Sequence, residues 1–153
     1  VYINDVDITQ LSMEERSSFR RWHIGFIFQN FNLIPEMNVF ENIVLPAKLM
    51  ERNISKKEVM RIAEELEIEE KLLQNPMTLS GGQQQRVAIA RAIYTHPTIL
   101  LGDELTGNLD STTMKFLKKM CKKYSQTMII VTHDERIAAM ADRIIQMKDG
   151  RVV

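Results

Sequence analysis

Hydrophobic and polar positions follow two different patterns along the chain. In the C-terminal part, short apolar runs at 98–101 and 128–131 alternate with helical patterns, and a third run, interrupted by one glutamine, follows at 144–147. Short continuous apolar runs are typical of parallel strands covered on both faces. Strands that alternate with helices predict an α/β protein built on a parallel sheet.

Two further strands are expected near the N-terminus. Residues 1–3 predict a strand that ends at a turn formed by Asn4 and Asp5. The apolar and aromatic run at 24–28 predicts a buried strand that ends in a polar loop at Gln29.

The stretch from about residue 30 to 94 is dominated by helical patterns. We expect it to be a helical subdomain inserted beside the sheet, with residues 1–29 and 95–153 forming the core. Internal repeats and low-complexity linkers are absent from the sequence. The pattern therefore predicts one α/β domain with an inserted helical part.

Capping residues predict where two helices of this middle region begin. Asn38 is suited to cap a helix over 39–45, which Pro46 should kink or end. Ser55 and Glu58 have the spacing of a capping box, in which two side chains satisfy orphan N–H groups. Apolar residues at helical spacing follow them and predict an amphipathic helix.

Three more elements are expected after residue 110. A helix should run from 111 to about 124, and the segment 132–135 should open a short helix that continues to about Ala141. The dipeptide 149–150, Asp-Gly, predicts a hairpin turn into residues 151–153.

The most distinctive segment is Leu-Ser-Gly-Gly-Gln-Gln-Gln-Arg at 79–86, called here the signature segment. Ser80 and Gln83 fit a capping box, which is the more common interpretation of those positions alone. Gly81 and Gly82 also leave the first N–H groups of the following helix open, and a helix N-terminus attracts anions. The segment therefore predicts a capped helix end that can receive a phosphate.

Two acidic residues follow the apolar run at 98–101. Asp103 and Glu104 would lie at the carboxyl end of a strand, where open α/β sheets bind ligands. One carboxylate there can hold Mg²⁺, and the other can polarise an attacking water. An isolated Asp-Glu pair is more often simply part of a loop, so the pair alone does not establish a site.

Composition excludes several classes of protein. The chain has 153 residues and a formal net charge of +0, which gives no broad electrostatic reason to expect nucleic acid as a partner. No apolar run approaches the length of a membrane span, so direct membrane insertion is not expected. The single Cys121 excludes an internal disulfide and fits a reducing compartment.

The signature segment and the Val-Ala-Ile-Ala-Arg-Ala that follows it resemble the signature motif of ATP-binding cassette (ABC) ATPases. Residues 101–104 resemble the Walker B element of that family, and 106–110 its D-loop. Residues 131–134 resemble the segment with the switch histidine, and Gln29 the Q-loop glutamine. These motifs stand in the family's order and cover nearly the whole chain.

This resemblance implies a P-loop NTPase (RecA-like) fold, with ATP as the ligand and Mg²⁺ as the cofactor. It implies that Asp103 and Gln29 hold the metal, Glu104 is the general base and His133 contacts the γ-phosphate. Gln29 would also sense the attacking water. The residues implied in ATP binding are Ser80, Gly81, Gly82, Gln83 and Asp110, and Asp110 is also a good helix cap.

The resemblance also implies partners. They are a second ATPase subunit, with ATP at the dimer interface, and a transmembrane permease subunit, at the cytoplasmic face of the membrane. The apolar loop residues Phe31, Leu33, Ile34 and Pro35 are either a cluster packed under a loop or a docking surface for that permease. The run from Gly25 to Pro46 and the three glutamines look most like the ATPases of lipoprotein release, macrolide export, antimicrobial-peptide export and cell division.

The sequence departs from the family's pattern in three places. Leu105 replaces the usual proline. Gly102 stands where the family commonly has a small residue that is larger than glycine. Both changes lie beside the general base and are expected to tune the hydrolysis reaction rather than abolish it. No Gly-x-x-x-x-Gly-Lys-Ser/Thr loop occurs in these residues. We therefore expect an N-terminally truncated ATPase domain, inactive alone, that lacks the strand between 128–131 and 144–147 and has two unpaired edges.

Two other functions stay open at this point. The chain could belong to an ABC ATPase that moves no solute, such as a cell-division signaller or a DNA- or ribosome-associated head. It could also be a degenerate binding module that kept the signature segment without catalysis.

Overall fold

A three-stranded parallel sheet organises the structure, a computed structural model that describes residues 1–103 and 111–153. The strands are β3 (Ile24–Ile27), β4 (Ile99–Asp103) and β5 (Thr127–Val131), in the order β3-β4-β5. Their registers pair Ile27 with Gly102, and Asp103 with Val131. The parallel sheet predicted from the alternating pattern is confirmed.

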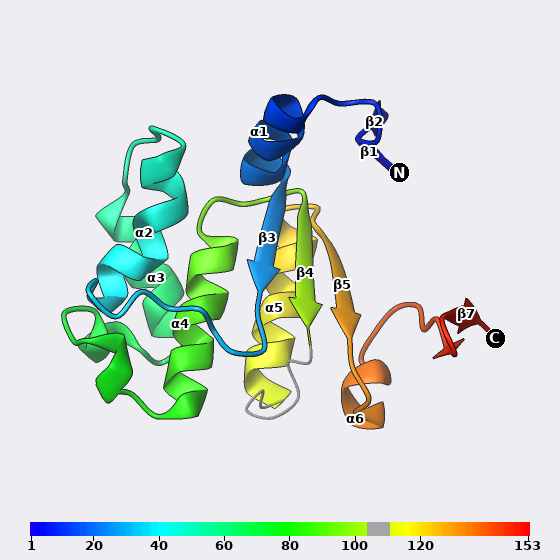
Figure 1. Ribbon diagram of the computed structural model, residues 1–153. Coiled ribbons are helices and arrows are strands. Elements are labelled where there is room, and N and C mark those ends of the chain that lie inside the picture. The colour runs from blue at the N-terminus through cyan, green and yellow to red at the C-terminus, as the bar shows by residue number, and fades with distance from the viewer. Residues whose placement is uncertain (104–110) are drawn as a thin grey trace.

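Helices cover one face of this sheet (Figure 1). They are α2 (Val39–Leu49), α3 (Lys56–Glu65), α4 (Gly81–Ile93) and α5 (Ser111–Lys123), with short 3₁₀ turns η1 (Glu69–Lys71) and η2 (Pro76–Thr78) between α3 and α4. One continuous hydrophobic core joins these helices to Ile27 and Leu100 of the sheet. Because the core is continuous, the division into a core and a subdomain of about 30–94 stays a prediction.

Among the described residues the other face of the sheet, called here the bare face, is largely exposed, which corrects the expectation that its strands are covered on both faces. Phe26 on β3 is exposed, and Ile129 and Val131 on β5 have exposed fractions of 51% and 61%. The alternating exposure along β5 shows a strand buried on one side only. β5 is also an edge strand, with no neighbour on its outer side in the described structure.

The N-terminal part contains the expected strand and one helix that the hydrophobic pattern did not predict. β1 (Tyr2–Ile3) and β2 (Val6–Asp7) form a hairpin, and Asn4 and Asp5 both have positive φ at its turn. α1 (Met13–His23) follows, but it buries none of its residues. A helix without a buried stripe leaves no periodic signal, and only its capping box of Ser12 and Glu15 marks it.

The capping residues of the middle region are placed largely as predicted. Asn38 caps α2 with a complete capping box, but Pro46 does not end this helix, which continues to Leu49. Ser55 caps α3 through the Glu58 N–H, yet only half of the predicted capping box forms. The Ser55 N–H donates instead to the hydroxyl of Tyr94 at 2.9 Å.

The C-terminal part differs most from the sequence prediction. After α6 (Glu135–Ala138) the chain forms a small hairpin of β6 (Met147–Lys148) and β7 (Arg151–Val152), with the predicted turn at 149–150. The predicted strand 144–147 was wrong for its first three residues, which are irregular. A strand needs a neighbour for its backbone hydrogen bonds, and none of the three sheet strands in the described structure pairs with these residues.

Among the residues that the structure describes, no helix is both long enough and apolar enough to cross a membrane.

Candidate functional site

Three of the predicted site residues lie at the carboxyl ends of the three parallel strands. Asp103 is the last residue of β4, while Gln29 and His133 each follow their strand by two residues. The register places these ends at the same end of the sheet (Figure 1). All three residues are exposed. Glu104 and Asp110 lie outside the described residues, and the remaining predicted residues belong to the signature segment.

Asp134 shapes the loop that carries His133. Its carboxylate caps α6 by accepting from the Arg136 N–H at 2.8 Å, and its own N–H donates to the Thr132 hydroxyl at 3.0 Å. The Arg136 guanidinium also donates to this carboxylate and lowers the pKa of Asp134 to about 2. Asp134 is therefore ionised at neutral pH and fixes the loop through its own neighbours.

The signature segment forms the N-terminus of α4. The Ser80 hydroxyl accepts from the Gln83 N–H at 3.4 Å, and the Gln83 side chain accepts from the Ser80 N–H at 3.0 Å. The predicted capping box is thereby confirmed as complete. It organises the first turn while the two glycines between these residues carry no side chain over the helix end.

Gly82 faces open space. A Cβ atom built on it would meet no other atom within 4 Å, and Ser80 and Gly81 are exposed. Gly25 is the opposite case, because its Cβ would lie 2.6 Å from the carbonyl oxygen of Ala92. Gly25 is needed for packing, whereas packing gives no reason for Gly82, and its open surroundings suit close approach by a phosphate.

The two predicted parts of the site occupy different layers of the molecule. α4 begins at the end of the molecule where the three strands finish, but within the layer of helices (Figure 1). Asp103 and Gln29 offer carboxylate and amide oxygens, the ligand type that Mg²⁺ prefers, so these residues fit the metal. No cluster of three or more metal-ligating side chains occurs within residues 1–103 and 111–153.

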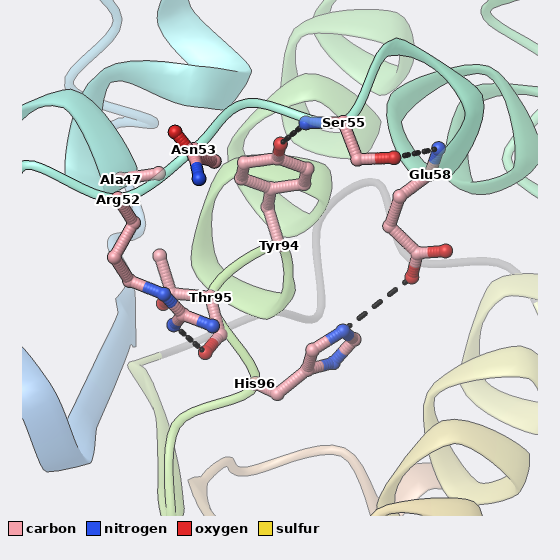
Figure 2. Close-up of a pocket in the computed structure, with 8 residues that line it drawn as sticks. All are labelled: Ala47, Arg52, Asn53, Ser55, Glu58, Tyr94, Thr95 and His96. Atoms are coloured by element: carbon pink, nitrogen blue, oxygen red, sulfur yellow. Dashed lines mark hydrogen bonds and ion pairs between the residues drawn. The ribbon is translucent and has the colours of Figure 1, made fainter.

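A polar cavity of about 140 Å³ lies at the amino end of β4, away from the predicted site (Figure 2). Its lining residues are Ala47, Arg52, Asn53, Ser55, Glu58, Tyr94, Thr95 and His96. The Arg52 guanidinium donates to the Thr95 carbonyl at 2.9 Å, and His96 lies 3.4 Å from the Glu58 carboxylate. Sequence patterns missed this cluster because its members come from two segments, 47–58 and 94–96, that are far apart along the chain.

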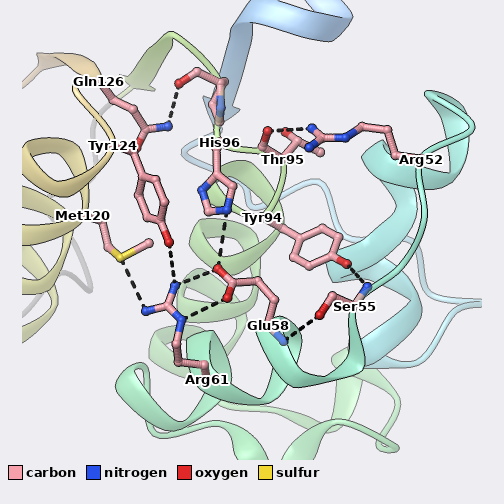
Figure 3. A network of polar contacts seen from close by, with 11 residues as sticks. Arg52, Ser55, Glu58, Arg61, Tyr94, Thr95, His96, Met120, Tyr124 and Gln126 are labelled. Atoms are coloured by element: carbon pink, nitrogen blue, oxygen red, sulfur yellow. Dashed lines mark hydrogen bonds and ion pairs between the residues drawn. The ribbon is translucent and has the colours of Figure 1, made fainter.

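The polar groups around this cavity join α3 to α5 (Figure 3). Arg61 donates two hydrogen bonds to Glu58, which lowers the pKa of Glu58, and a third to the hydroxyl of Tyr124. The ring of His96 stacks on Tyr124 at 4.0 Å, and burial lowers the pKa of His96. These groups mainly satisfy one another, so we interpret them as a structural junction.

Of the four apolar residues predicted in the loop after β3, some are buried and others are exposed. Leu33 is buried in the core and Phe31 packs against it, which favours the interpretation as a cluster under a loop for these two. Ile34 is partly exposed and Pro35 is exposed. Any docking surface on this loop therefore begins at Ile34.

Candidate ligands at the carboxyl ends of parallel strands and an exposed, capped helix N-terminus are features of α/β proteins that bind nucleotides. The sequence matches the ABC transporter family over residues 1–107. The chain belongs to this family, and membership implies the enzyme class of an ATPase.

Named relatives agree with this assignment. The chain is 39% identical to the lipoprotein-releasing system ATP-binding protein LolD of Porphyromonas gingivalis, over 97% of this chain and 70% of that protein. It is 43% identical to the uncharacterised ABC transporter ATP-binding protein MJ0796 of Methanocaldococcus jannaschii, over 99% of this chain and 69% of that protein. It is 38% identical to the macrolide export ATP-binding/permease protein MacB of Rhodopirellula baltica, over 99% of this chain and 23% of that protein.

Solved structures show the same fold. A dimeric post-hydrolysis state of the MJ0796 cassette bound to ADP and Pi superposes with a TM-score of 0.88 at 40% identity, over 99% of this chain and 69% of that chain. CbiO1 of Clostridium perfringens, part of the CbiONQ transporter complex, gives a TM-score of 0.84 at 31% identity, over 99% of this chain and 63% of that chain. The fold is that of an ABC ATPase cassette, of which this chain covers a part.

Proposed function

We propose that this chain is part of the ATP-hydrolysing subunit of an ABC transporter, which energises the export or release of a substrate through a membrane partner. The observation that carries the proposal is the capped, exposed N-terminus of α4 with open space at Gly82. The relatives' names, which refer to lipoprotein release and macrolide export, support the direction of transport.

Each site residue has a proposed role on this account. The N–H groups of Gly81 and Gly82 would bind the phosphates of ATP held by a second subunit, together with Ser80, Gln83 and Asp110. Glu104 would accept a proton from the attacking water, and His133 would donate toward the γ-phosphate. Asp103 and Gln29 would hold Mg²⁺, which neutralises charge on the phosphates when bound.

The assembly that follows is a dimer with ATP at its interface, bound to a transmembrane permease at the cytoplasmic face of the membrane. The dimeric state of the MJ0796 cassette bound to ADP and Pi supports the first part. The assembly would also include a segment with a phosphate-binding loop that covers the bare face of the sheet. The exposed apolar residues of that face and the unpaired edge of β5 support this part of the proposal. A polypeptide of these 153 residues alone should not hydrolyse ATP.

The test is ATP hydrolysis by the protein that carries these residues together with a phosphate-binding loop. Glu104→Gln should slow hydrolysis by about 10²–10⁴-fold, the usual contribution of a general base, while ATP binding is retained. Phosphate release at saturating ATP measures the effect. Hydrolysis within a factor of about three of the unmodified protein would show that Glu104 is not the base.

A further inference from the structure

The loop between β3 and α2, residues 28–37, has an unfavourable backbone conformation. Phe31 and Asn32 have φ values of 59° and 47°, the left-handed region that residues with a side chain rarely adopt. Within the loop, the Phe31 N–H donates to the Phe28 carbonyl at 3.1 Å and the Asn32 N–H to the Asn30 carbonyl at 2.6 Å, but the carbonyls of Phe31 and Asn32 are bound from outside it. This loop, called here the Gln29 loop, carries the proposed metal ligand Gln29 near its start.

Arg91 supplies those bonds. One nitrogen of its guanidinium donates to the Asn32 carbonyl at 2.6 Å, and the other to the Phe31 carbonyl at 2.6 Å. Arg91 stands in α4, the helix that the signature segment opens. The planar guanidinium with two parallel donors fits two adjacent carbonyls better than a single ammonium group can.

The guanidinium of Arg91 is held without a carboxylate. Burial lowers the pKa of Arg91 from its ordinary value, and within residues 1–103 and 111–153 no acidic side chain pairs with it. A partly buried charge is costly unless polar groups compensate it, and here carbonyl oxygens of the Gln29 loop do so. The loop and the guanidinium therefore depend on each other.

The rest of the Gln29 loop is also held by side chains of the helical layer. Asn42 of α2, which is fully buried, accepts from the Ile34 N–H at 2.8 Å and donates back to the Ile34 carbonyl at 3.0 Å. Asn75, just before the signature segment, donates to the Pro35 carbonyl at 2.9 Å. From residue 31 onward the loop is bound to the helices, and Gln29 stands between these bonds and the sheet.

We propose that Arg91 is a positioning residue that fixes the Gln29 loop to α4, so that one rigid unit sets the places of Gln29 and of the signature segment. This inference rests on the proposed ATPase function. A membrane partner that displaces the Gln29 loop would then displace the phosphate-binding end of α4 with it.

The test compares Arg91→Met with Arg52→Met. The control also removes an arginine-to-carbonyl bond, here from the α2–α3 connection to the segment after α4, but it does not touch the Gln29 loop. Hydrogen exchange at the amides of 31–34 should rise about tenfold or more in Arg91→Met and stay unchanged in Arg52→Met. In the hydrolysing protein, kcat should fall about tenfold in Arg91→Met, with KM for ATP changed less than about threefold.

Arg91→Lys provides a second variant if Arg91→Met does not fold. It keeps the charge but cannot donate to both carbonyls as a planar fork, so its exchange rates and kcat should be intermediate. Unchanged exchange in the Gln29 loop of Arg91→Met would overturn the inference, as would raised exchange with an unchanged kcat. If the unmodified protein hydrolyses no ATP, the proposed function fails instead, and the exchange measurement still decides whether Arg91 holds the loop.

Discussion

The two faces of the sheet differ sharply. On the helix-covered face, Ile27 and Leu100 are fully buried, and they pack into one continuous core with α2 to α5. On the opposite face, Ile129 and Val131 are more than half exposed, and β5 has a free outer edge. The helix-covered face is therefore fully packed, whereas the bare face exposes apolar side chains of the kind that are usually buried.

This difference separates the two halves of the candidate site. The N-terminus of α4 lies on the helix-covered side of the sheet, and its capping box is already complete. Asp103 ends β4 and His133 follows β5, two strands of the sheet whose other face is bare. A phosphate-binding helix end can therefore be preformed here, while the strand-end residues need a covering segment to become a site.

The largest expected effect concerns matched truncations on the two sides. Ile89→Ala, in the fully buried part of α4, should cost about 2–5 kcal/mol of unfolding free energy through lost contacts and a cavity. Ile129→Ala, on the bare face, should cost less than about 1 kcal/mol. Chemical denaturation measures both, and equal losses would mean that the bare face is covered in solution.

Two glycines sharpen the same comparison. Gly25→Ala places a Cβ 2.6 Å from the Ala92 carbonyl oxygen and 2.8 Å from Leu100 and Pro97, so it should cost about 1–3 kcal/mol. Gly82→Ala meets open space and should change stability by less than about 1 kcal/mol.

Gly82→Ala should nevertheless weaken the nucleotide-dependent dimer, because the added methyl group lies over the phosphate-binding helix end. Thermal melting and sedimentation with ATP separate the two effects. Unimpaired dimerisation of Gly82→Ala would argue against a phosphate at this position.

The smallest expected effect is on pH dependence. Burial lowers the pKa of His96 below its unfolded value of about 6.5, so the unfolded state binds more protons in that range. Stability from the neutral ring is fully present above about pH 6.5 and is lost as pH falls through the folded pKa. Melting temperatures from pH 7.5 to 5 should therefore fall more steeply in the unmodified protein than in His96→Gln.

Asp134, which lies after β5, contributes to the pH dependence of stability in a different pH range from His96. Its pKa of about 2 is below the ordinary value, so the contribution of its carboxylate to stability is lost only as pH falls from about 4 toward 2.

The His96 prediction can fail in one clear way. If the melting temperatures of the unmodified protein and His96→Gln change in parallel with pH, His96 is not the source of the sensitivity near neutral pH.

The sequence predicted the elements whose signals are local. The start of α4 was predictable because Ser80 and Gln83 cap it and apolar residues follow, and β4 because its residues form a continuous apolar run. α1 was missed because it buries no residue, and 144–146 was predicted as a strand although its pairing depends on a neighbour.

Within the candidate site, the apolar run before each residue was enough to predict that Gln29, Asp103 and His133 lie at the ends of strands. The bond from Arg91 to Phe31 spans 60 residues, and no local pattern predicts such a contact. An arginine within the Ala- and Ile-rich stretch 87–93 was the available signal, because a charge in a buried stretch needs a particular partner.

The most direct test of the account is a calorimetric titration of Mg-ATP into a polypeptide of these 153 residues, repeated after a segment with the phosphate-binding loop and its strand is added in trans. We predict no micromolar binding by the polypeptide alone, and binding together with a higher melting temperature once the segment is present. Micromolar ATP affinity of the polypeptide alone, with no gain from the added segment, would contradict the account.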